Sequence, residues 1–343
     1  MVASNSPAVD EHALFEYLQA NWTGPLDRSS FLVTRFTSGH SNLTYLIEVN
    51  GERYVLRRPP PGPLPPTAHD VLRECRILEC LSSVRAPRPV LACADASVIG
   101  APFYVMEFVD GIVIGETVPP EFEGADVRRV IGEEVVTTLV EIHTLDWRSA
   151  GLGDLARSTG YLDRQIRRWR GQWEVNRTRA IPQLEELGDR LEAAKPASSR
   201  VSLVHGDYKL DNLIFSRGSV PRCLAVADWE MATIGDPLAD LGYLLAFWLE
   251  PDEAAVGPLA LGRATAEPGF ESRDQLRMRY ESLTGRPAED LGWYEALALW
   301  KLAVLLEGSY RRFTAGTTDD PFFAELGEGI PMVADRALEM LDA

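Results

Sequence analysis

The chain has 343 residues, of which 45% are hydrophobic and 25% are charged. This composition is typical of a folded globular protein of about two domains, and it excludes a disordered, collagen-like or coiled-coil chain. The 34 basic and 51 acidic residues give a formal net charge of −17, which repels nucleic acids and anionic lipids. We therefore expect neither a nucleic-acid partner nor a membrane partner.

Signals for secretion or membrane insertion are not visible in the sequence. The first twenty residues carry three acidic side chains and lack the apolar core of a secretory signal. The longest apolar stretch, residues 243–249, is far shorter than a bilayer span. The four cysteines form no C-x-x-C pair, as is typical of free thiols in a reducing compartment. We expect a cytoplasmic protein.

The first hundred residues alternate short apolar runs with turn signals. Asn50-Gly51 joins two of these runs and is the strongest hairpin signal in the chain, because both residues tolerate positive φ. The expected elements are a three-stranded antiparallel sheet within residues 31–57, a proline-rich linker at 59–66, a helix at 68–81 and short strands at 89–93 and 103–108. This part of the chain thus predicts an antiparallel sheet with one long helix.

Helical periodicity dominates from Gly111 onward. The expected helices lie at 127–145, 162–177 and 184–193 and in a tail from about 237, where residues 293–312 are apolar on more than one face, as in a buried helix. A small β region lies between them, at 201–228. We predict an α+β fold with a nucleotide-binding N-lobe of residues 1–108, built on the antiparallel sheet, and a larger, mostly helical C-lobe of residues 109–343.

The segment from Val204 to Asn212 carries the densest set of polar groups. An apolar strand breaks into His205-Gly206-Asp207, and Asn212 follows five residues after the aspartate. H-x-D-x-x-x-x-N is the arrangement of a phosphoryl-transfer loop, in which the aspartate accepts a hydroxyl proton and the asparagine oxygen ligates Mg²⁺. The alternative is that both residues are ordinary turn formers that bond their own backbone.

A second acidic group follows the next strand. Asp228 ends the run at 223–227, where a carboxylate is costly to bury unless it is paired or bound to a metal. We expect it to ligate Mg²⁺. Glu230 would either reach a second ion or remain a solvated charge. Asp236 and Asp240, in the turn before the next helix, are interpreted as structural residues that organise the loop.

Candidate phosphate-binding groups lie in the first hundred residues. The loop of residues 37–42 joins two strands, and backbone amides in such a turn can hold phosphate oxygens. Arg57 ends a strand where a cation would meet the phosphates, and Glu74 on the following helix would hold it. Considered singly, Arg57 has the simpler interpretation of a surface arginine, and Glu74 that of an exposed charge on a helix.

The order of these motifs carries a family resemblance. S-G-x-S-N, V-L-R, R-E-C, Y-V-M-E-F, H-G-D-x-x-x-x-N and D-W-E with G-D-P-x-x-D-L resemble the aminoglycoside phosphotransferase and choline-kinase-like superfamily of small-molecule kinases. Within it, V-L-R-R-P-P and S-N-L-T-Y are similar to the branch whose domains are sometimes fused to acyl-CoA dehydrogenases. The resemblance covers residues 30 to 315 and implies a bilobal protein-kinase-like fold.

The resemblance implies a role for each matching residue. Asp207 would be the catalytic base, supported by His205, and Asn212 and Asp228 would hold Mg²⁺. The groups implied for ATP are Arg57 with Glu74 on its phosphates, Ser38, Gly39, Ser41 and Asn42 as the nucleotide roof, and Glu107, Phe108 and Val109 as the adenine hinge. Two features depart from the pattern: an arginine stands where most kinases have lysine, and the roof loop has a single glycine.

These observations lead us to expect a Mg²⁺-dependent phosphotransferase that moves the γ-phosphate of ATP to a hydroxyl of a small molecule. The branch resembled suggests a hydroxyacyl thioester or related acid as acceptor, with Arg311 and Arg312 at its anionic end. The alternatives are an aminoglycoside or choline-type kinase, or a catalytically silent nucleotide-binding module. Protein kinase activity has no support, because no A-P-E follows D-W-E. Both a monomer and a homodimer remain open.

Overall fold

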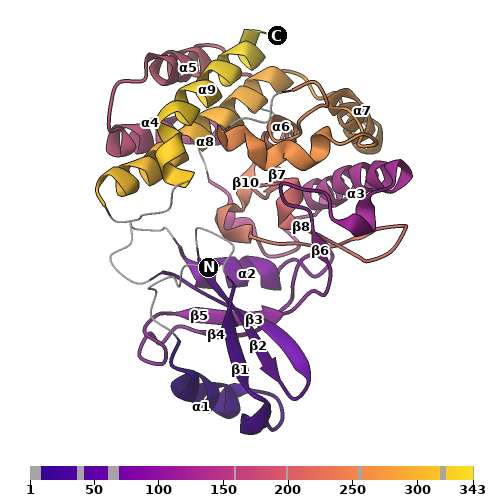
Figure 1. The fold of residues 1–343 in the computed structure, drawn as a ribbon, viewed down its shortest axis with the longest axis vertical. Helices are drawn as coiled ribbons and strands as arrows, with labels where there is room; N and C mark the ends of the chain where they lie inside the picture. The colour runs from indigo at the N-terminus through magenta and orange to yellow at the C-terminus, as the bar shows by residue number, and fades with distance from the viewer. Residues whose placement is uncertain are drawn as a thin grey trace. The chain divides into compact units, whose positions relative to one another are not determined.

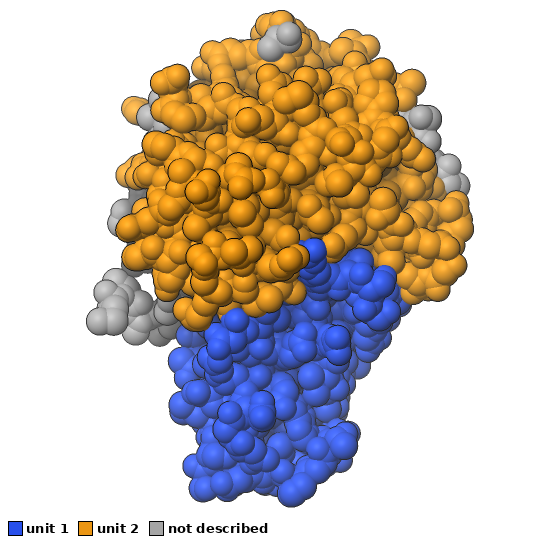
Figure 2. Space-filling view, turned by 90° about the vertical axis from the view of Figure 1, so that its right-hand side faces the viewer, with its two compact units in different colours: residues 1–110, 225–230 blue, residues 111–224, 231–343 orange. Residues whose placement is uncertain are grey.

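The structure is a computed structural model that describes residues 9–36, 42–60, 69–157, 160–197, 200–253, 257–316 and 322–342. The chain divides into two compact units (Figure 2). Unit 1 comprises residues 1–110 and 225–230, and unit 2 comprises residues 111–224 and 231–343. The short segment 225–230 therefore belongs to unit 1 although the chain on both sides of it belongs to unit 2.

Unit 1 is built on an antiparallel sheet (Figure 1). Its strands are β1 (Leu32–Arg35), β2 (Leu43–Val49), β3 (Glu52–Arg58), β4 (Pro89–Cys93) and β5 (Phe103–Glu107), in the order β1-β2-β3-β5-β4. The β2–β3 turn at Asn50 and Gly51 has φ values of 56° and 80°, which confirms the predicted hairpin. The sheet has five strands rather than three, because β5 pairs with the free edge of β3 and β4 pairs with β5.

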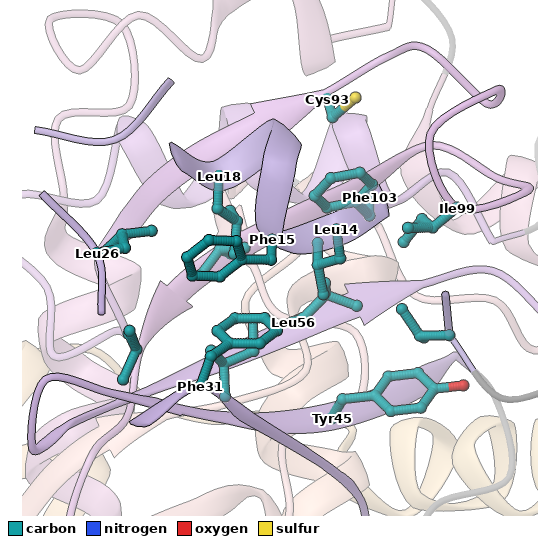
Figure 3. Close-up of a cluster of buried hydrophobic side chains, with 14 of the residues drawn as sticks. Leu14, Phe15, Leu18, Leu26, Phe31, Tyr45, Leu56, Cys93, Ile99 and Phe103 are labelled. Atoms are coloured by element: carbon teal, nitrogen blue, oxygen red, sulfur yellow. The ribbon is translucent and has the colours of Figure 1, made fainter. Parts of the chain in front are cut away.

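Two helices belong to the described part of unit 1, where one long helix was expected. Helix α1 (Glu11–Asn21), which was not predicted, begins at the N-cap Asp10 and buries Leu14, Phe15 and Leu18. These side chains pack in one cluster with Leu56 and Phe103 of the sheet (Figure 3). Helix α2 (Val71–Glu79) is shorter than the predicted 68–81. It begins where the Asp70 side chain accepts a hydrogen bond from the Arg73 amide.

Unit 2 is mostly helical. Its helices are α3 (Ala125–Thr144), α4 (Tyr161–Asn176), α5 (Pro182–Ala193), α6 (Leu238–Ala246), α7 (Arg273–Thr284), α8 (Leu291–Thr314) and α9 (Phe322–Asp342). Small sheets are formed by β7 (Ser202–Val204) with β10 (Thr233–Gly235), and by β6 (Ile112–Val113), β8 (Leu213–Phe215) and β9 (Cys223–Val226). None of the helices in the described ranges is long and apolar enough to cross a membrane. The antiparallel sheet of unit 1 and the helices of unit 2 agree with the expected α+β fold.

Helix α8 organises unit 2, because it packs against α4, α5, α6 and α9. Most of its side chains up to Val304 are buried, which confirms the expectation of a buried helix at 293–312. The approach to α6 depends on Gly242, where an added Cβ would lie 2.5 Å from the Cβ of Tyr294. This contact brings α6 and α8 close enough for both to reach the loop that follows β7.

The α6–α8 contact gives a stability prediction. We expect Gly242→Ala to lower the free energy of unfolding by about 1–3 kcal/mol, because the methyl group overpacks the contact with Tyr294. Gly171→Ala, in the middle of α4 with no atom within 4 Å of the new Cβ, is the matched control. It should raise stability by roughly 0.5–1 kcal/mol through helix propensity. Urea denaturation measures both, and equal effects would contradict the close approach of α6 to α8.

Candidate active site

The loop after β7 carries the predicted catalytic residues, and an acid on α6 anchors it. The two carboxylate oxygens of Asp240 accept hydrogen bonds from the amides of His205, at 2.6 Å, and Gly206, at 2.7 Å. Gly206 has φ of 84°, and a Cβ there would lie 2.8 Å from the carbonyl oxygen of Met231. The loop therefore needs glycine at this position, and Asp240 satisfies the buried amide of His205 and the partly buried amide of Gly206.

Asp207 sits at the end of this anchored turn and contacts Asn212. The side-chain nitrogen Nδ2 of Asn212 donates to the backbone carbonyl of Asp207, at 2.7 Å, and to the Oδ2 of Asp207, at 3.0 Å. The Asp207 amide lies 3.3 Å from Nδ1 of His205, which accepts its hydrogen bond. The structure thus brings His205, Asp207 and Asn212 together in unit 2 and shows that the two polar side chains bond each other.

The surroundings of Asp207 keep its carboxylate ionised. Burial by itself would raise the pKa of the Asp207 carboxyl, but the ammonium groups of Lys209 and Lys301 and a hydrogen bond with Tyr243 hold that pKa below its usual range. An ionised, oriented carboxylate at this place can bind a hydroxyl group and accept its proton.

The three groups named around Asp207, which are Lys209, Lys301 and Tyr243, were not predicted as site residues. Lys301 of α8 is buried, donates to the Gly206 carbonyl, and lies 4.4 Å from the ring centre of Tyr243 of α6. The sequence held one signal for Lys301, since it is a charged residue within the most apolar stretch of the tail. Its partner could not be read from the sequence, because Lys301 and Gly206 are far apart in the chain.

The two acids at the start of α6 have the structural roles that we expected. Besides its bonds to the loop, Asp240 lies 3.3 Å from Nε2 of His143, and Nδ1 of that ring is 2.9 Å from the hydroxyl of Tyr280. Asp236 accepts hydrogen bonds from the Leu238 amide, at 3.0 Å, and the Tyr294 hydroxyl, at 2.9 Å. Asp240 thus anchors the loop, whereas Asp236 joins α6 to α8.

The predicted phosphate clamp forms a compact ion-pair cluster in unit 1. Arg57 on β3 lies between two acids, with Nη1 2.6 Å from Glu74 Oε1 and Nη2 3.0 Å from Asp228 Oδ1. The side chains of Arg57 and Glu74 are 8% and 1% exposed, so neither is the surface charge of the simpler interpretation. The Trp229 amide also donates to Glu74, at 3.1 Å, which joins segment 225–230 to α2.

Burial controls the titration of this cluster. It raises the pKa of Glu74, with Arg57 opposing the shift and Asp228 adding to it. Burial disfavours the Arg57 cation as well, yet Glu74 and Asp228 together raise its pKa above the ordinary value. The guanidinium therefore stays charged, and its two ends hold one carboxylate each.

Asp228 has the backbone strain that is common at functional positions. Its φ is 65°, in the left-handed region that non-glycine residues rarely adopt. Its side chain is 32% exposed, and only Oδ1 is engaged by Arg57. The ion pair with Arg57 therefore does not use Oδ2.

The remaining predicted nucleotide-binding residues are only partly described. Ser38, Gly39 and Ser41 lie outside the described residues. Asn42 donates from Nδ2 to Glu230 Oε2, at 2.9 Å, and its Oδ1 is 3.1 Å from Nδ1 of His69. Glu230 is therefore bonded to a side chain of its own unit, which departs from a purely solvated charge.

The predicted hinge residues Glu107, Phe108 and Val109 follow or end β5. Glu107 Oε1 accepts a hydrogen bond from the Arg88 amide, at 3.1 Å, so the carboxylate fixes the adjacent strand β4 rather than remaining free. The guanidinium of Arg53 lies 4.2 Å from the ring centre of Phe108. Their backbone role toward a nucleotide stays a prediction.

The donor chemistry fits a magnesium ion with few protein ligands. In the parts of the chain described here, no three His, Cys, Asp or Glu side chains are grouped to hold a metal. Mg²⁺ needs only one or two protein oxygens when phosphate and water fill its other positions. Asp228 offers Oδ2, and Asn212, which uses its Nδ2 toward Asp207, offers Oδ1. Asp228 belongs to unit 1 and Asn212 to unit 2, and their meeting at one ion stays a prediction.

The anchoring of the loop can be tested without a substrate. Asp240→Asn removes one of the two acceptors for the His205 and Gly206 amides, and we expect hydrogen exchange at these amides to become at least tenfold faster. Asp236→Asn is the control, because Asp236 is an equally buried acid of the same turn whose hydrogen bonds go to Leu238 and Tyr294. Equal protection of the two amides in both variants would contradict the anchor.

Comparison with known proteins shows which family the chain is similar to. The profile of the phosphotransferase enzyme family matches residues 32–276. Acyl-CoA dehydrogenase family member 11 of Gallus gallus is 35% identical over 315 residues, which cover 90% of this chain and 40% of that protein. The chain thus spans about two fifths of the length of this relative.

Solved structures share the fold. A candidate aminoglycoside phosphotransferase of Ralstonia eutropha has a TM-score of 0.78 and 31% identity and covers 98% of this chain, which in turn covers 99% of that structure. Aminoglycoside phosphotransferase APH(4)-Ia, in a ternary complex with AMP-PNP and hygromycin B, has a TM-score of 0.61 and 15% identity, with 96% and 98% covered. The latter likeness concerns the fold alone. The chain belongs to the phosphotransferase enzyme family.

Proposed function

We propose that this chain is a Mg²⁺-dependent phosphotransferase that moves the γ-phosphoryl group of ATP to a hydroxyl of a small molecule. The observation that carries the proposal is the ionised Asp207 carboxylate, bonded to Asn212 and placed on a loop that Asp240 anchors. A turn former in an ordinary loop would not require a buried acid such as Asp240 to bind its backbone, nor the nearby ammonium groups of Lys209 and Lys301. The arrangement therefore favours chemistry over the simple turn.

In the proposed reaction, Asp207 orients the acceptor hydroxyl and takes its proton. The hydroxyl oxygen forms a bond to the γ-phosphorus of ATP, and the bond from that phosphorus to the β–γ bridging oxygen breaks, which releases ADP. His205 fixes the base by accepting a hydrogen bond from the Asp207 amide, at 3.3 Å. Most of the catalysis would come from positioning and from stabilising negative charge.

The nucleotide would be held by unit 1. Arg57 carries the positive charge for the phosphates, and Glu74 keeps its guanidinium in place. The predicted roof of Ser38, Gly39, Ser41 and Asn42 and the hinge of Glu107, Phe108 and Val109 remain part of this proposal. Nucleotide use is supported by the fold shared with APH(4)-Ia, whose solved complex contains AMP-PNP.

Asn212 and Asp228 would supply the protein oxygens for Mg²⁺. Both are hard donors with one oxygen unused by the hydrogen bonds described above, which suits this ion. When bound, Mg²⁺ neutralises the charge of the phosphates and fixes their orientation.

For the acceptor, we propose a hydroxyacyl thioester or a related hydroxy acid. The similarity to acyl-CoA dehydrogenase family member 11 supports this class, because a kinase-like segment in a protein of that name indicates acyl metabolism. Arg311 and Arg312 in the last turn of α8 remain candidate contacts for its anionic end. Aminoglycosides and choline are the alternatives, supported by the family and fold alone.

Substitutions of the two key acids should separate chemistry from nucleotide binding. We expect Asp207→Ala to lower phosphoryl transfer by about 10²–10⁴-fold while MgATP still raises the melting temperature, since the base is lost but the nucleotide site is intact. Asp228→Ala should lose the magnesium-dependent part of that thermal shift. Asp189→Asn, an exposed acid paired with Arg170, is the control and should behave as wild type.

Two results would count against these assignments. Full turnover by Asp207→Ala would remove Asp207 as the base. A wild-type thermal shift with ATP that is the same with and without magnesium would favour the silent nucleotide-binding module, because a protein without a metal site has no reason to respond to the ion.

A panel of acceptors tests the substrate class. ADP release from MgATP would be measured with hydroxyacyl thioesters, free hydroxy acids, aminoglycosides, choline and sugars. We expect stimulation by the hydroxyacyl compounds, and no stimulation by the same acyl thioesters lacking the hydroxyl group, which is the matched control. Stimulation confined to aminoglycosides or choline would overturn this choice of acceptor and leave the phosphotransferase assignment intact.

A further inference from the structure

The buried Lys301 is the strongest unexplained feature of unit 2. The chain contains only three lysines, Lys195, Lys209 and Lys301, and the last lies in the middle of the apolar helix α8. It is 7% exposed, and burying an ammonium group costs more free energy than burying a methionine of similar length. Stability of α8 alone therefore gives no reason for a lysine here.

Lys301 reaches the peptide bond that precedes the base. Its ammonium group donates to the Gly206 carbonyl, while the Gly206 amide donates to Asp240. The residue before Asp207 is therefore held on both sides, by an acid of α6 and a cation of α8. Because Gly206 has φ of 84° and no side chain, these two bonds define the direction in which the chain delivers Asp207.

Several charged and aromatic groups surround the Lys301 ammonium. Asp240 and Tyr243 face it from α6, Arg168 and Trp169 from α4, and Asp207 and Lys209 from the loop. Burial lowers the pKa of Lys301 to about 8, with Asp207 and Asp240 opposing this and Arg168 and Lys209 adding to it. The rings of Trp169 and Tyr243 attract the Lys301 ammonium, and this cation–π attraction offsets part of the free energy lost when the ammonium is desolvated.

We propose that Lys301 is a positioning residue for Asp207, which holds the Gly206 carbonyl and, through its positive charge, the orientation of the Asp207 carboxylate. This inference rests on the proposed function, because it assigns Lys301 a task in aiming the base. It requires no contact between Lys301 and either substrate.

Turnover of a set of variants tests the proposal. Lys301→Met keeps the volume but removes the donor and the charge, and we expect kcat to fall about 100-fold with the KM for MgATP within about twofold. Lys301→Gln, which can still donate to Gly206, should lose less. Lys195→Met is the matched control, because Lys195 is partly exposed and pairs with Asp163. The probe is ADP release from MgATP with water as acceptor.

The pH profile gives a readout that a purely structural role would not change. We expect wild-type kcat to fall as the pH rises through about 8, because Lys301 then loses its charge. In Lys301→Arg this limb should be absent, since a guanidinium stays protonated. A profile that is the same in both proteins would overturn the role of the charge.

A titration that needs no turnover keeps the inference separate from the proposed function. With only three lysines, ¹³C labelling at lysine Cε gives three signals, which the Lys195→Met and Lys301→Gln variants assign. We expect Lys301 to titrate near pH 8 and to titrate lower in Asp207→Asn, because the Asp207 charge raises its pKa. A Lys301 signal that titrates as an ordinary lysine, or that ignores Asp207→Asn, would overturn the inference.

The outcomes distinguish the two proposals. Absence of Asp207-dependent ADP release from wild type, both with water and with every acceptor of the panel above, contradicts the proposed function, and the NMR titration still decides whether Lys301 is coupled to Asp207. If wild type is active and Lys301→Met matches Lys195→Met, the positioning role alone is wrong. Should circular dichroism show that Lys301→Met does not fold, Lys301→Gln and the NMR titration decide.

Discussion

Every polar group of the buried turn before Asp207 needs a partner, and this requirement shapes unit 2. The turn buries the amide of His205 and partly buries the amide and carbonyl of Gly206, and an unsatisfied buried group costs about 1–3 kcal/mol. Asp240 and Lys301 meet this requirement from two different helices. Because α6 and α8 must lie close together to do so, a glycine at position 242 is needed where they cross. The position of Asp207 is thus set by helix packing.

Buried groups need partners in unit 1 as well. There a buried cation, Arg57, lies between the acids Glu74 and Asp228. An arginine serves this geometry better than the lysine of most kinases, since its planar fork presents separate nitrogens to two carboxylates, whereas an ammonium is a single point of charge. The departure from the kinase pattern therefore has a physical reason within the unit. Asp228 gains a fixed orientation from the pair, at a backbone conformation that few residues adopt.

The sequence predicted local features well and long-range ones poorly. The hairpin at Asn50-Gly51 and the buried helix at 293–312 follow from residues that are neighbours in the chain, and both were confirmed. The loop that carries His205, Asp207 and Asn212 was also predicted from residues that are neighbours in the chain. Helix α1 was missed because its packing partners in the sheet lie far along the chain, and strand β10 was missed because three residues form it only by pairing with β7.

The periodicity of the sequence does not show which residues that are far apart in the chain contact each other. The alternatives of a surface arginine at Arg57 and an exposed charge at Glu74 stayed open until the structure showed both side chains buried. Lys301 could be recognised from the sequence only as unusual, because its function depends on Gly206, 95 residues earlier. In each case the decisive information is which opposite charge or carbonyl shares the buried site, and that is a property of the tertiary structure.

The charge near Asp207 differs from the charge of the whole chain, and the difference bears on the proposed acceptor. A net charge of −17 attracts cations at long range, but salt screens such fields beyond about 8 Å at physiological ionic strength. Near Asp207, Lys209 pairs with Asp211 Oδ2, at 2.8 Å, and the buried Lys301 donates to the Gly206 carbonyl and lies close to Asp240. The net charge of the chain therefore says little about the acceptor, because the charged groups nearest Asp207 compensate one another.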